Sequence, residues 1–329
     1  MVCAVTDNKG SNQTSEKRLR KPSWLKVKLP TGKKFHWIKE QAKNHQMATV
    51  CQEARCPNIG ECWTVGTATF MVMGDTCTRG CRFCAVKTGN PNGWLDHTEP
   101  ENLANTIHEA GWKYVVITSV DRDDLPDGGA GHFAECISKT RALNPETLVE
   151  VLIPDFRGES EHLQKIIDAQ PDVIAQNIET VERLTHTVRD RRAGYQQTMD
   201  CLARVKEQNP QIFTKSSIML GLGETEAEIR QCLSDLRAHG VDIVTLGQYL
   251  QPSSKQLPVQ HYVTPEAFDG WKNIAEKEYG FLYCASGPLV RSSYKAGEFF
   301  IAQLIQNRRL SVADPMSDRV KQRLQQEQL

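Results

Sequence analysis

Three cysteines near residue 80 have a spacing that suits a metal cluster. Cys77, Cys81 and Cys84 form a C-x3-C-x2-C group, and Gly80 permits a tight turn among them. Thiolates this close can wrap one cubic cluster of four irons. One iron is then left without a protein ligand and can chelate a small molecule. A simple electron carrier favours four cysteines in a C-x2-C-x2-C-x3-C run, which this sequence lacks.

Two other kinds of cysteine site are alternatives to this cluster. A structural zinc site favours paired C-x2-C units with four ligands, and a thioredoxin-like dithiol uses one such pair. Only Cys81 and Cys84 have this spacing, and neither alternative explains Cys77. The nine histidines form no H-E-x-x-H zinc motif. The residues therefore favour the iron–sulfur interpretation.

A second group of three cysteines lies upstream of the first. Cys51, Cys56 and Cys62 form a C-x4-C-x5-C group that matches no common zinc finger. We expect Pro57 and Gly60 to break any helix, so the group does not read as one helical face. Three thiolates again leave a four-iron cluster one ligand short. The remaining five cysteines are scattered and fit small apolar residues of the core: Cys3, Cys136, Cys201, Cys232 and Cys284.

From residue 68 onward, the hydrophobic pattern alternates between strands and helices. The runs that suit buried parallel strands are Ala68–Gly74, Tyr114–Val120, Leu148–Pro154, Val173–Glu179, Phe213–Gly221 and Ile243–Leu250. The helical patterns are Glu101–Ala110, Gly131–Leu143, Ser160–Ala169, Tyr195–Glu207, Glu224–His239 and Pro265–Glu278. This alternation predicts an α/β fold, an open, partial (β/α)6 barrel of the TIM type. Cys77 follows the first strand, at the barrel end that carries active sites.

These patterns divide the chain into four regions. We expect a basic, flexible arm over residues 1–34, with docking to an acidic protein as its alternative role. An extension with the second cluster covers 35–67, the barrel covers 68–280, and a C-terminal segment that closes the second cluster covers 281–329, ending in a polar tail. The 40 basic and 40 acidic residues cancel, so we expect no binding of nucleic acid or of a membrane surface. Without a membrane-spanning run or a secretory signal, the sequence predicts a cytoplasmic protein.

Several of these motifs carry a resemblance to a known family. The C-x3-C-x2-C group, with Phe83 before its last cysteine, resembles the signature of the radical S-adenosylmethionine (SAM) superfamily. The C-x4-C-x5-C group and the Arg-Ser-Ser-Tyr segment at 291–294 extend the likeness to the lipoyl synthase family, from about Lys21 to about Ala296. Segments 119–125, 177–180 and 219–224 also match, although Gln176 stands where this family usually has histidine.

The resemblance implies a sulfurtransferase that uses SAM and two 4Fe-4S clusters. In this family, the cluster on the C-x3-C-x2-C group cleaves SAM to a 5′-deoxyadenosyl radical. The radical removes hydrogens at C6 and C8 of a protein-bound N6-octanoyl-lysine. The second, auxiliary cluster supplies the two sulfurs of the lipoyl product. The implied partners are octanoylated lipoyl domains of 2-oxoacid dehydrogenases, the glycine-cleavage H protein, an electron donor such as ferredoxin or flavodoxin, and an iron–sulfur carrier.

The resemblance also implies roles for individual residues. A serine of the Arg-Ser-Ser-Tyr segment would ligate the auxiliary cluster, and Ser293 is a better match for it than Ser292. A serine oxygen is a hard ligand, so the iron it holds should leave more easily. Arg291 is expected at the substrate or in the cluster shell, with a plain salt bridge as its alternative.

Four further residues are expected to contact SAM: Phe83, Asn177, Glu179 and Glu224. A core aromatic, helix caps or hydrogen bonds at the barrel rim are their alternatives. Gly221 and Gly223 would let the backbone approach a ligand closely. Asp121, Asp123 and Asp124 form either a rim network or a solvated loop.

Two other functions compete with this interpretation. Another radical SAM sulfur-inserting enzyme, of the biotin synthase type, is disfavoured because that family lacks the C-x4-C-x5-C group. A non-catalytic iron–sulfur or zinc module would serve electron transfer or nucleic-acid binding. The open iron, the neutral charge and the six-unit barrel argue against it.

Overall fold

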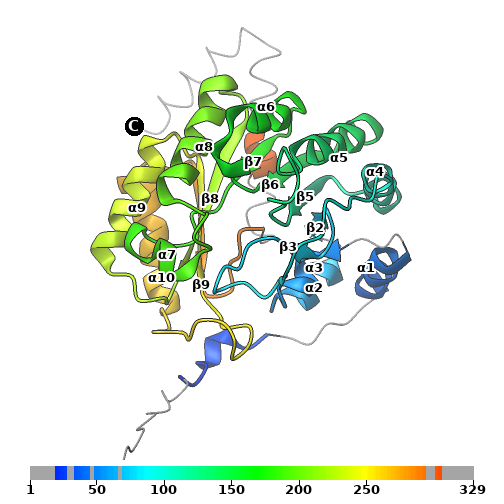
Figure 1. Ribbon diagram of the computed structural model, residues 1–329. Coiled ribbons are helices and arrows are strands. Elements are labelled where there is room, and N and C mark those ends of the chain that lie inside the picture. The colour runs from blue at the N-terminus through cyan, green and yellow to red at the C-terminus, as the bar shows by residue number, and fades with distance from the viewer. Residues whose placement is uncertain (1–18, 28–32, 45–47, 66–68, 294–300, 306–329) are drawn as a thin grey trace, which may run out of the picture.

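The computed structural model describes residues 19–27, 33–44, 48–65, 69–293 and 301–305. Its main element is an eight-stranded sheet of order β1-β2-β5-β6-β7-β8-β9-β10 (Figure 1). The six expected strands are all present: β2 (Thr69–Val72), β5 (Tyr114–Ser119), β6 (Leu148–Leu152), β7 (Val173–Ala175), β8 (Phe213–Leu220) and β9 (Ile243–Gln248). Each pairs in parallel with the next, which confirms the predicted alternation. Most of the basic arm, Cys3, Tyr294 and the polar tail lie outside the described residues.

Two strands at the edges of the sheet were not expected. The two-residue strand β1 (Ala48–Thr49) pairs antiparallel with β2, and β10 (Tyr283–Gly287) pairs in parallel with β9. Strand β10 starts after residue 280, so the sheet continues into the predicted C-terminal segment. Within the described part of the chain, β1 and β10 pair with one neighbour each, so the sheet is open.

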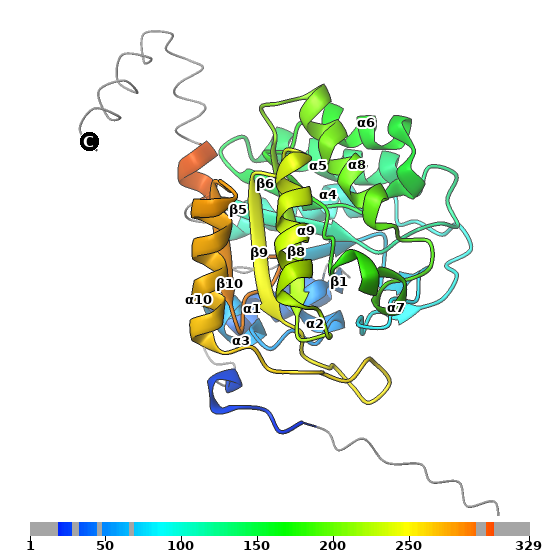
Figure 2. The ribbon, with the colours of Figure 1, turned by 90° about the vertical axis from the view of Figure 1, so that its left-hand side faces the viewer.

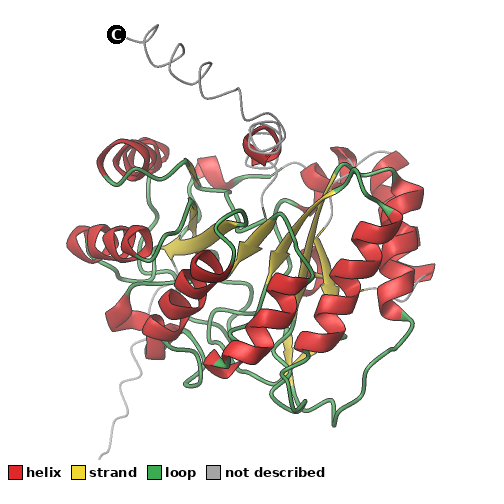
Figure 3. Cartoon of the chain, turned by 90° about the horizontal axis from the view of Figure 1, so that it is seen from above, coloured by secondary structure: helices red, strands yellow, loops and turns green. Residues whose placement is uncertain are grey.

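Helices cover the outer face of the curved sheet (Figure 3). They are α4 (Glu99–Ala110), α5 (Ala130–Leu143), α6 (Ser160–Asp168), α8 (Tyr195–Gln208), α9 (Glu226–Ala238) and α10 (Pro265–Asn273), which continues as a π-helix over Ile274–Glu278. At most of their ends, these helices begin or end within two residues of the predicted position. Helix α9 begins at Glu226 because Thr225 and Glu228 form a capping box. Helix α10 packs beside β10 (Figure 2).

The N-terminal extension packs beside strand β2 (Figure 1). It contains α1 (Lys33–Asn44), α2 (Val50–Glu53) and α3 (Ile59–Val65), preceded by the 3-10 turn Ser23–Leu25. Trp37 joins it to the barrel by contacting Trp112, whose ring also packs against Phe70. Within the extension, Phe35 meets the fully buried Trp63. This apolar packing fixes the helices that carry the upstream cysteines.

The two ends of the barrel differ. At the N-terminal ends of the strands, Ile301 and Ile305 pack against Leu148, Phe213 and Ile243 and cover that end. The C-terminal strand ends remain free to carry a site. No helix in the described ranges combines the length and the hydropathy needed to cross a bilayer.

Candidate active site

Two adjoining cavities lie at the C-terminal ends of the strands. Their volumes are about 310 Å³ and about 260 Å³, and we call them the upstream-cysteine cavity and the SAM-motif cavity after the cysteines that line them. Their shared lining residues are Val50, Ala54, Phe83, Cys84, Asn177, Glu179 and Ser292. Because so much of the lining is common, a molecule bound in one cavity can contact a molecule bound in the other.

Cys77, Cys81 and Cys84 all line the SAM-motif cavity. Cys77 ends the short strand β3 (Thr76–Cys77), which pairs with β4 (Lys87–Thr88) and so closes the cysteine loop on itself. Backbone N–H groups point at two of the sulfurs: Arg79 N lies 3.4 Å from Cys77 Sγ, and Asp190 N lies 3.2 Å from Cys81 Sγ. Such N–H groups stabilise thiolates, the form that binds iron.

The sequence did not predict which residues of this loop adopt a left-handed backbone conformation. Gly80 was expected to allow the tight turn, but a Cβ there would have its nearest neighbours 3.9 Å away. Positive φ angles occur instead at Met73 and Gly74, 67° and 86°, where β2 leads into the loop. Met73 N donates to Glu99 Oε2 (2.8 Å), and His132 Nε2 lies 2.7 Å from the same oxygen.

Glu99, His132 and Cys136 offer three possible metal-ligand atoms within 4.8 Å of one another. The Glu99 oxygen is already shared by Met73 and His132. We therefore assign this group to support of the turn rather than to metal binding.

A buried arginine fastens the cysteine loop to the barrel. Arg79 is 4% exposed, and its guanidinium bonds the carboxylates of Asp123 and Asp155. Asp121 lies 3.3 Å from the same guanidinium, so the rim network considered from the sequence is present for Asp121 and Asp123. Asp124 instead pairs with Arg122 at 2.8 Å. These contacts fix the loop to the ends of strands β5 and β6.

The thiols of this loop are hard to ionise without metal. Burial raises the pKa of Cys77 and of Cys81 to about 12, and it also raises the pKa of Cys84. For Cys77, the nearby Asp121 carboxylate raises the pKa further. A metal centre of net positive charge would reverse this preference, so binding of iron must release protons here.

The upstream cysteines line the other cavity. Cys51 lies in α2, Cys56 follows in a turn, and Cys62 lies in α3. The expected break at Pro57 is present, but the expectation for Gly60 was wrong, because this residue lies in the first turn of α3. Glycine is tolerated there because the first turn of a helix contributes few intrahelical hydrogen bonds.

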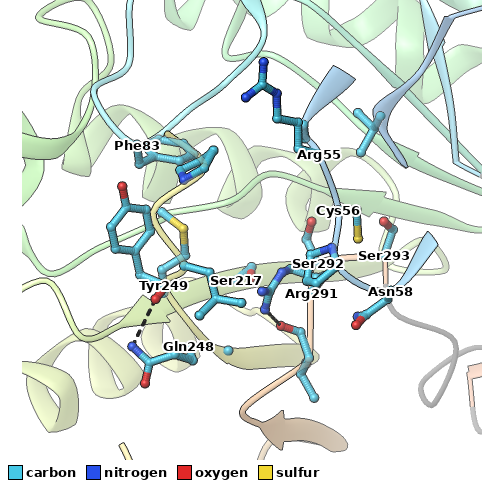
Figure 4. A pocket seen from close by; sticks show the side chains of 18 of the residues that line it. Arg55, Cys56, Asn58, Phe83, Ser217, Gln248, Tyr249, Arg291, Ser292 and Ser293 are labelled. Atoms are coloured by element: carbon cyan, nitrogen blue, oxygen red, sulfur yellow. Dashed lines mark hydrogen bonds between the residues drawn. The ribbon is translucent and has the colours of Figure 1, made fainter. Parts of the chain in front are cut away.

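The segment after β10 brings three predicted residues to the upstream cysteines. Arg291, Ser292 and Ser293 line the same cavity as Cys51, Cys56 and Cys62 (Figure 4). Arg291 Nη1 donates to the Val290 carbonyl oxygen at 2.6 Å and makes no ion pair with a described carboxylate. Burial lowers the pKa of Arg291, and the neighbouring Cys56 thiol opposes this shift. The upstream cysteines and the segment after β10 thus bring three sulfurs and two serine hydroxyls to this cavity, and Cys84 adds a fourth sulfur from the shared lining.

The residues expected to contact SAM do not all lie together. Phe83, Asn177 and Glu179 belong to the shared lining of the two cavities. Asn177 Nδ2 donates to Glu179 Oε1 (3.0 Å), whereas Asn177 Oδ1 is buried without a partner among the described residues. Burial raises the pKa of Glu179. This polar pair at the junction can bind a polar ligand.

Glu224 lies outside the lining of both cavities. Its carboxylate accepts the N–H groups of Gly221 and Leu222, at 2.6 and 2.9 Å. Gly221 was expected to let the backbone approach a ligand, but the close neighbours of this glycine are protein atoms. A Cβ there would lie 2.2 Å from Gln248 Nε2. Both residues therefore build the turn after β8, and the hydrogen-bonding alternative for Glu224 is the one observed.

Part of the upstream-cysteine cavity is apolar, which the sequence did not predict. Ile218, Met219, Leu250 and Pro252 line it at the ends of strands β8 and β9. Tyr249 lies with them (Figure 4). Their position at the ends of the fifth and sixth predicted strands was the sequence signal that could have placed them in the site. This surface can accommodate an alkyl chain beside both groups of cysteines.

Comparisons with known proteins agree with this geometry. The model of the radical SAM superfamily matches residues 71–236, and that of the N-terminal domain of lipoyl synthase matches residues 4–56. The fold is similar to that of HydG, a maturase of the [FeFe]-hydrogenase, with a TM-score of 0.52, 14% identity, and coverage of 65% of this chain and 50% of that one. The structure of Streptococcus suis SuiB bound to precursor peptide SuiA also gives a TM-score of 0.52, with 9% identity and coverage of 77% of this chain and 53% of that one.

With its open parallel barrel and its cysteine loop at the strand ends, the chain is a radical SAM enzyme. Lipoyl synthase of Legionella pneumophila (strain Paris) is 55% identical over 91% of both chains. Lipoyl synthase of Halobacterium salinarum is 59% identical over 86% of this chain and 91% of the relative. The mitochondrial lipoyl synthase of Culex quinquefasciatus is 57% identical over 90% of this chain and 79% of the relative. Within the superfamily, the chain belongs to the lipoyl synthase family.

Proposed function

We propose that the two cavities together convert a protein-bound N6-octanoyl-lysine to N6-lipoyl-lysine by adding sulfur at C6 and C8. The observation that carries this proposal is the shared lining, which places Cys84 of one cysteine group on the cavity of the other group. When bound, SAM and two 4Fe-4S clusters supply the 5′-deoxyadenosyl radical and the sulfur. The two adjoining cavities then allow hydrogen removal and sulfur addition at the same carbon of the octanoyl chain.

The residues of the SAM-motif cavity have three roles in this proposal. Cys77, Cys81 and Cys84 hold the cluster that binds SAM and leave one iron open for the cofactor. Phe83 shields the junction from water. Asn177 and Glu179 bind a polar part of SAM, a role supported by the unpaired, buried Asn177 oxygen.

The residues of the upstream-cysteine cavity hold the auxiliary cluster and the substrate. Cys51, Cys56 and Cys62 supply three thiolates, and Ser293 supplies the fourth ligand. The donor set fits a cluster that must give up sulfur, because a hydroxyl binds thiophilic iron less firmly than a thiolate does. Arg291 lies beside Cys56, in the shell of this cluster. The apolar strand ends of β8 and β9 then accept the octanoyl chain.

The partners follow from this chemistry. The substrate is an octanoylated lipoyl domain of a 2-oxoacid dehydrogenase or the glycine-cleavage H protein. A ferredoxin- or flavodoxin-type protein supplies electrons, and an iron–sulfur carrier rebuilds the auxiliary cluster. A cytoplasmic setting suits thiols that must stay reduced.

A single anaerobic reaction tests the proposal. The purified protein is incubated with SAM, a reductant and an octanoylated lipoyl domain, and intact-mass spectrometry follows the domain. We expect two added sulfurs, 5′-deoxyadenosine as co-product, and about eight irons per chain if each cysteine group holds a cube. A colourless zinc protein, or one with about four irons per chain, would contradict the proposal.

A further inference from the structure

A buried asparagine links the two segments that form the upstream-cysteine cavity. Asn58 lies in the turn between Cys56 and Cys62, and it is 2% exposed. Its side-chain Nδ2 donates a hydrogen bond of 2.6 Å to the carbonyl oxygen of Leu289, 231 positions further along the chain. Leu289 follows β10 and precedes Ser293 by four residues. The bond therefore connects the cysteine turn to the segment that carries the serines.

The two ends of the Asn58 amide have different surroundings. The Nδ2 end is bonded to Leu289, while Oδ1 is buried and has no hydrogen-bond partner among the described residues. An unsatisfied buried oxygen is destabilising, so core packing alone does not explain an amide at this position. Its stabilising contribution is the N–H donor, because the amide bonds the Leu289 carbonyl without bringing a charge into the site.

The location of Asn58 connects this bond to the cavity. Asn58 lines the upstream-cysteine cavity, and Figure 4 shows it with Cys56 and Ser293 on one side of the view, across from Phe83 and Tyr249. The Asn58 backbone N–H also points at the Cys56 sulfur. One residue therefore contacts both a cysteine ligand and the segment of the serine ligand.

We propose that Asn58 is a positioning residue for the auxiliary cluster, because its amide fixes the serine-bearing segment against the cysteine turn. Without this bond, Cys51, Cys56 and Cys62 keep their places in the packed extension. The segment after β10 is then free to shift, and the fourth ligand is lost from its position. The inference rests on the proposed function, since it assumes that a cluster forms between these two segments.

The Asn58→Asp variant is the sharpest test, because it keeps the shape of the side chain and replaces the donor by an acceptor. We expect iron to fall from about eight to about four per chain. Where the auxiliary cluster still forms, its iron affinity should fall by about 10- to 100-fold, the range known for outer-shell partners of metal ligands, and a chelator should remove this iron faster than from the unaltered chain. SAM cleavage to 5′-deoxyadenosine should persist, because Cys77, Cys81 and Cys84 are untouched.

Two further variants separate positioning from general destabilisation. Asn58→Ser is too short to reach Leu289 and adds no charge, so it should repeat the result, and it carries the test if Asn58→Asp does not fold. Asn144 is a matched control: it is also buried, and its Nδ2 donates to Ala104 and Thr140 carbonyls far from both cavities. Asn144→Ala should lower thermal stability and keep the full iron content.

The outcomes distinguish the inference from the function on which it rests. If the unaltered chain carries about eight irons and both Asn58 variants keep them, with the normal rate of loss to chelator, the positioning role is wrong and the proposed function stands. If the unaltered chain itself carries only about four irons, the auxiliary cluster is absent and both proposals fail.

Discussion

The guanidinium of Arg79 places its two terminal nitrogens on the carboxylate of Asp155, at 2.6 and 2.7 Å. Arg79 lies between two cluster cysteines, and Asp155 lies just after strand β6. The pair is therefore a direct link between the cysteine loop and the rigid part of the barrel. Bidentate arginine–carboxylate pairs of this kind fix orientation as well as distance.

Replacing Arg79 by methionine should destabilise the protein strongly. The change leaves Asp155 buried without its cation, whereas Asp123 keeps Arg157 and Arg192 as partners. Breaking a buried pair such as Arg79–Asp155 costs about 3–5 kcal/mol. Chemical denaturation of the metal-free protein measures this loss. Lys139→Met is the control, since Lys139 pairs with Glu101 at the exposed surface, where a pair contributes at most about 1 kcal/mol. Equal effects of the two changes would contradict the buried link.

The same network predicts how stability changes in acid. Burial alone would raise the pKa of Asp123, but hydrogen bonds from Arg79 outweigh it and lower the pKa to about 2. The unfolded value is about 3.9. Asp123 therefore stabilises the folded state above about pH 4, and this contribution is lost as the pH falls through about 2. Asp123→Asn should flatten the decline of unfolding free energy over this range, whereas Asp269→Asn, at an exposed carboxyl, should leave the decline unchanged.

Gly221→Ala should be destabilising although it adds one methyl group. Gly221 has φ of 101°, and the new Cβ would lie 2.2 Å from Gln248 Nε2 and 2.6 Å from the His261 carbonyl oxygen. The strain and the displaced Gln248 amide should lower the unfolding free energy by at least about 2 kcal/mol. Gly270 in α10 has nothing within 4 Å of its Cβ position. Gly270→Ala should raise stability by about 0.5–1 kcal/mol, and a loss there would refute this explanation.

Ser293→Cys tests the role of the serine ligand. A fourth thiolate should hold iron as well as or better than the hydroxyl, so the iron content should stay at about eight per chain. Lipoyl formation should be lost, because the iron that must leave is now held by sulfur. Ser292→Ala is the matched control and should retain product formation. Full activity of Ser293→Cys would show that this serine is not the ligand whose release matters.

Two cysteine variants should separate the two halves of the reaction. Cys81→Ala should lose about four irons and all 5′-deoxyadenosine formation. Cys56→Ala should also lose about four irons but should still cleave SAM, without adding sulfur to the octanoylated domain. Iron analysis and chromatography of the nucleoside products measure both effects. Loss of SAM cleavage in both variants would mean that the two centres are not independently assembled.

The sequence predicted the barrel strands and the cysteine loops because both signals are local. Apolar runs specify buried parallel strands, and cysteine spacing specifies a cluster loop. Strand β10 was missed because its residues, Tyr283–Gly287, are mostly small and give a weak strand signal. The start of α3 was not predicted because Gly60 was expected to interrupt a helix.

The other differences depend on contacts between distant parts of the chain. The bond from Asn58 to Leu289 and the approach of Gly221 to Gln248 involve residues that no sequence window brings together. Glu224 accepts hydrogen bonds from the backbone of its own turn, which could not be foreseen from the residue types, and its contact with SAM stays a prediction. Long-range packing decides which polar side chains face a cavity.

The order of the segments along the chain has a consequence for biogenesis. The partners that fasten the C-x3-C-x2-C loop, Asp121, Asp155, Asp190 and Gln256, all precede the serine segment in the chain. The serine segment near residue 293 leaves the ribosome much later, and chains fold from the N-terminal side during synthesis. Under the proposed function, a nascent polypeptide can therefore complete the SAM-cleaving site before Ser293, the proposed fourth ligand of the auxiliary cluster, has been synthesised. Under the proposed function, a chain that ends before Leu289 would keep the SAM-cleaving site but lack Ser293. It would then form the radical without adding sulfur to the substrate.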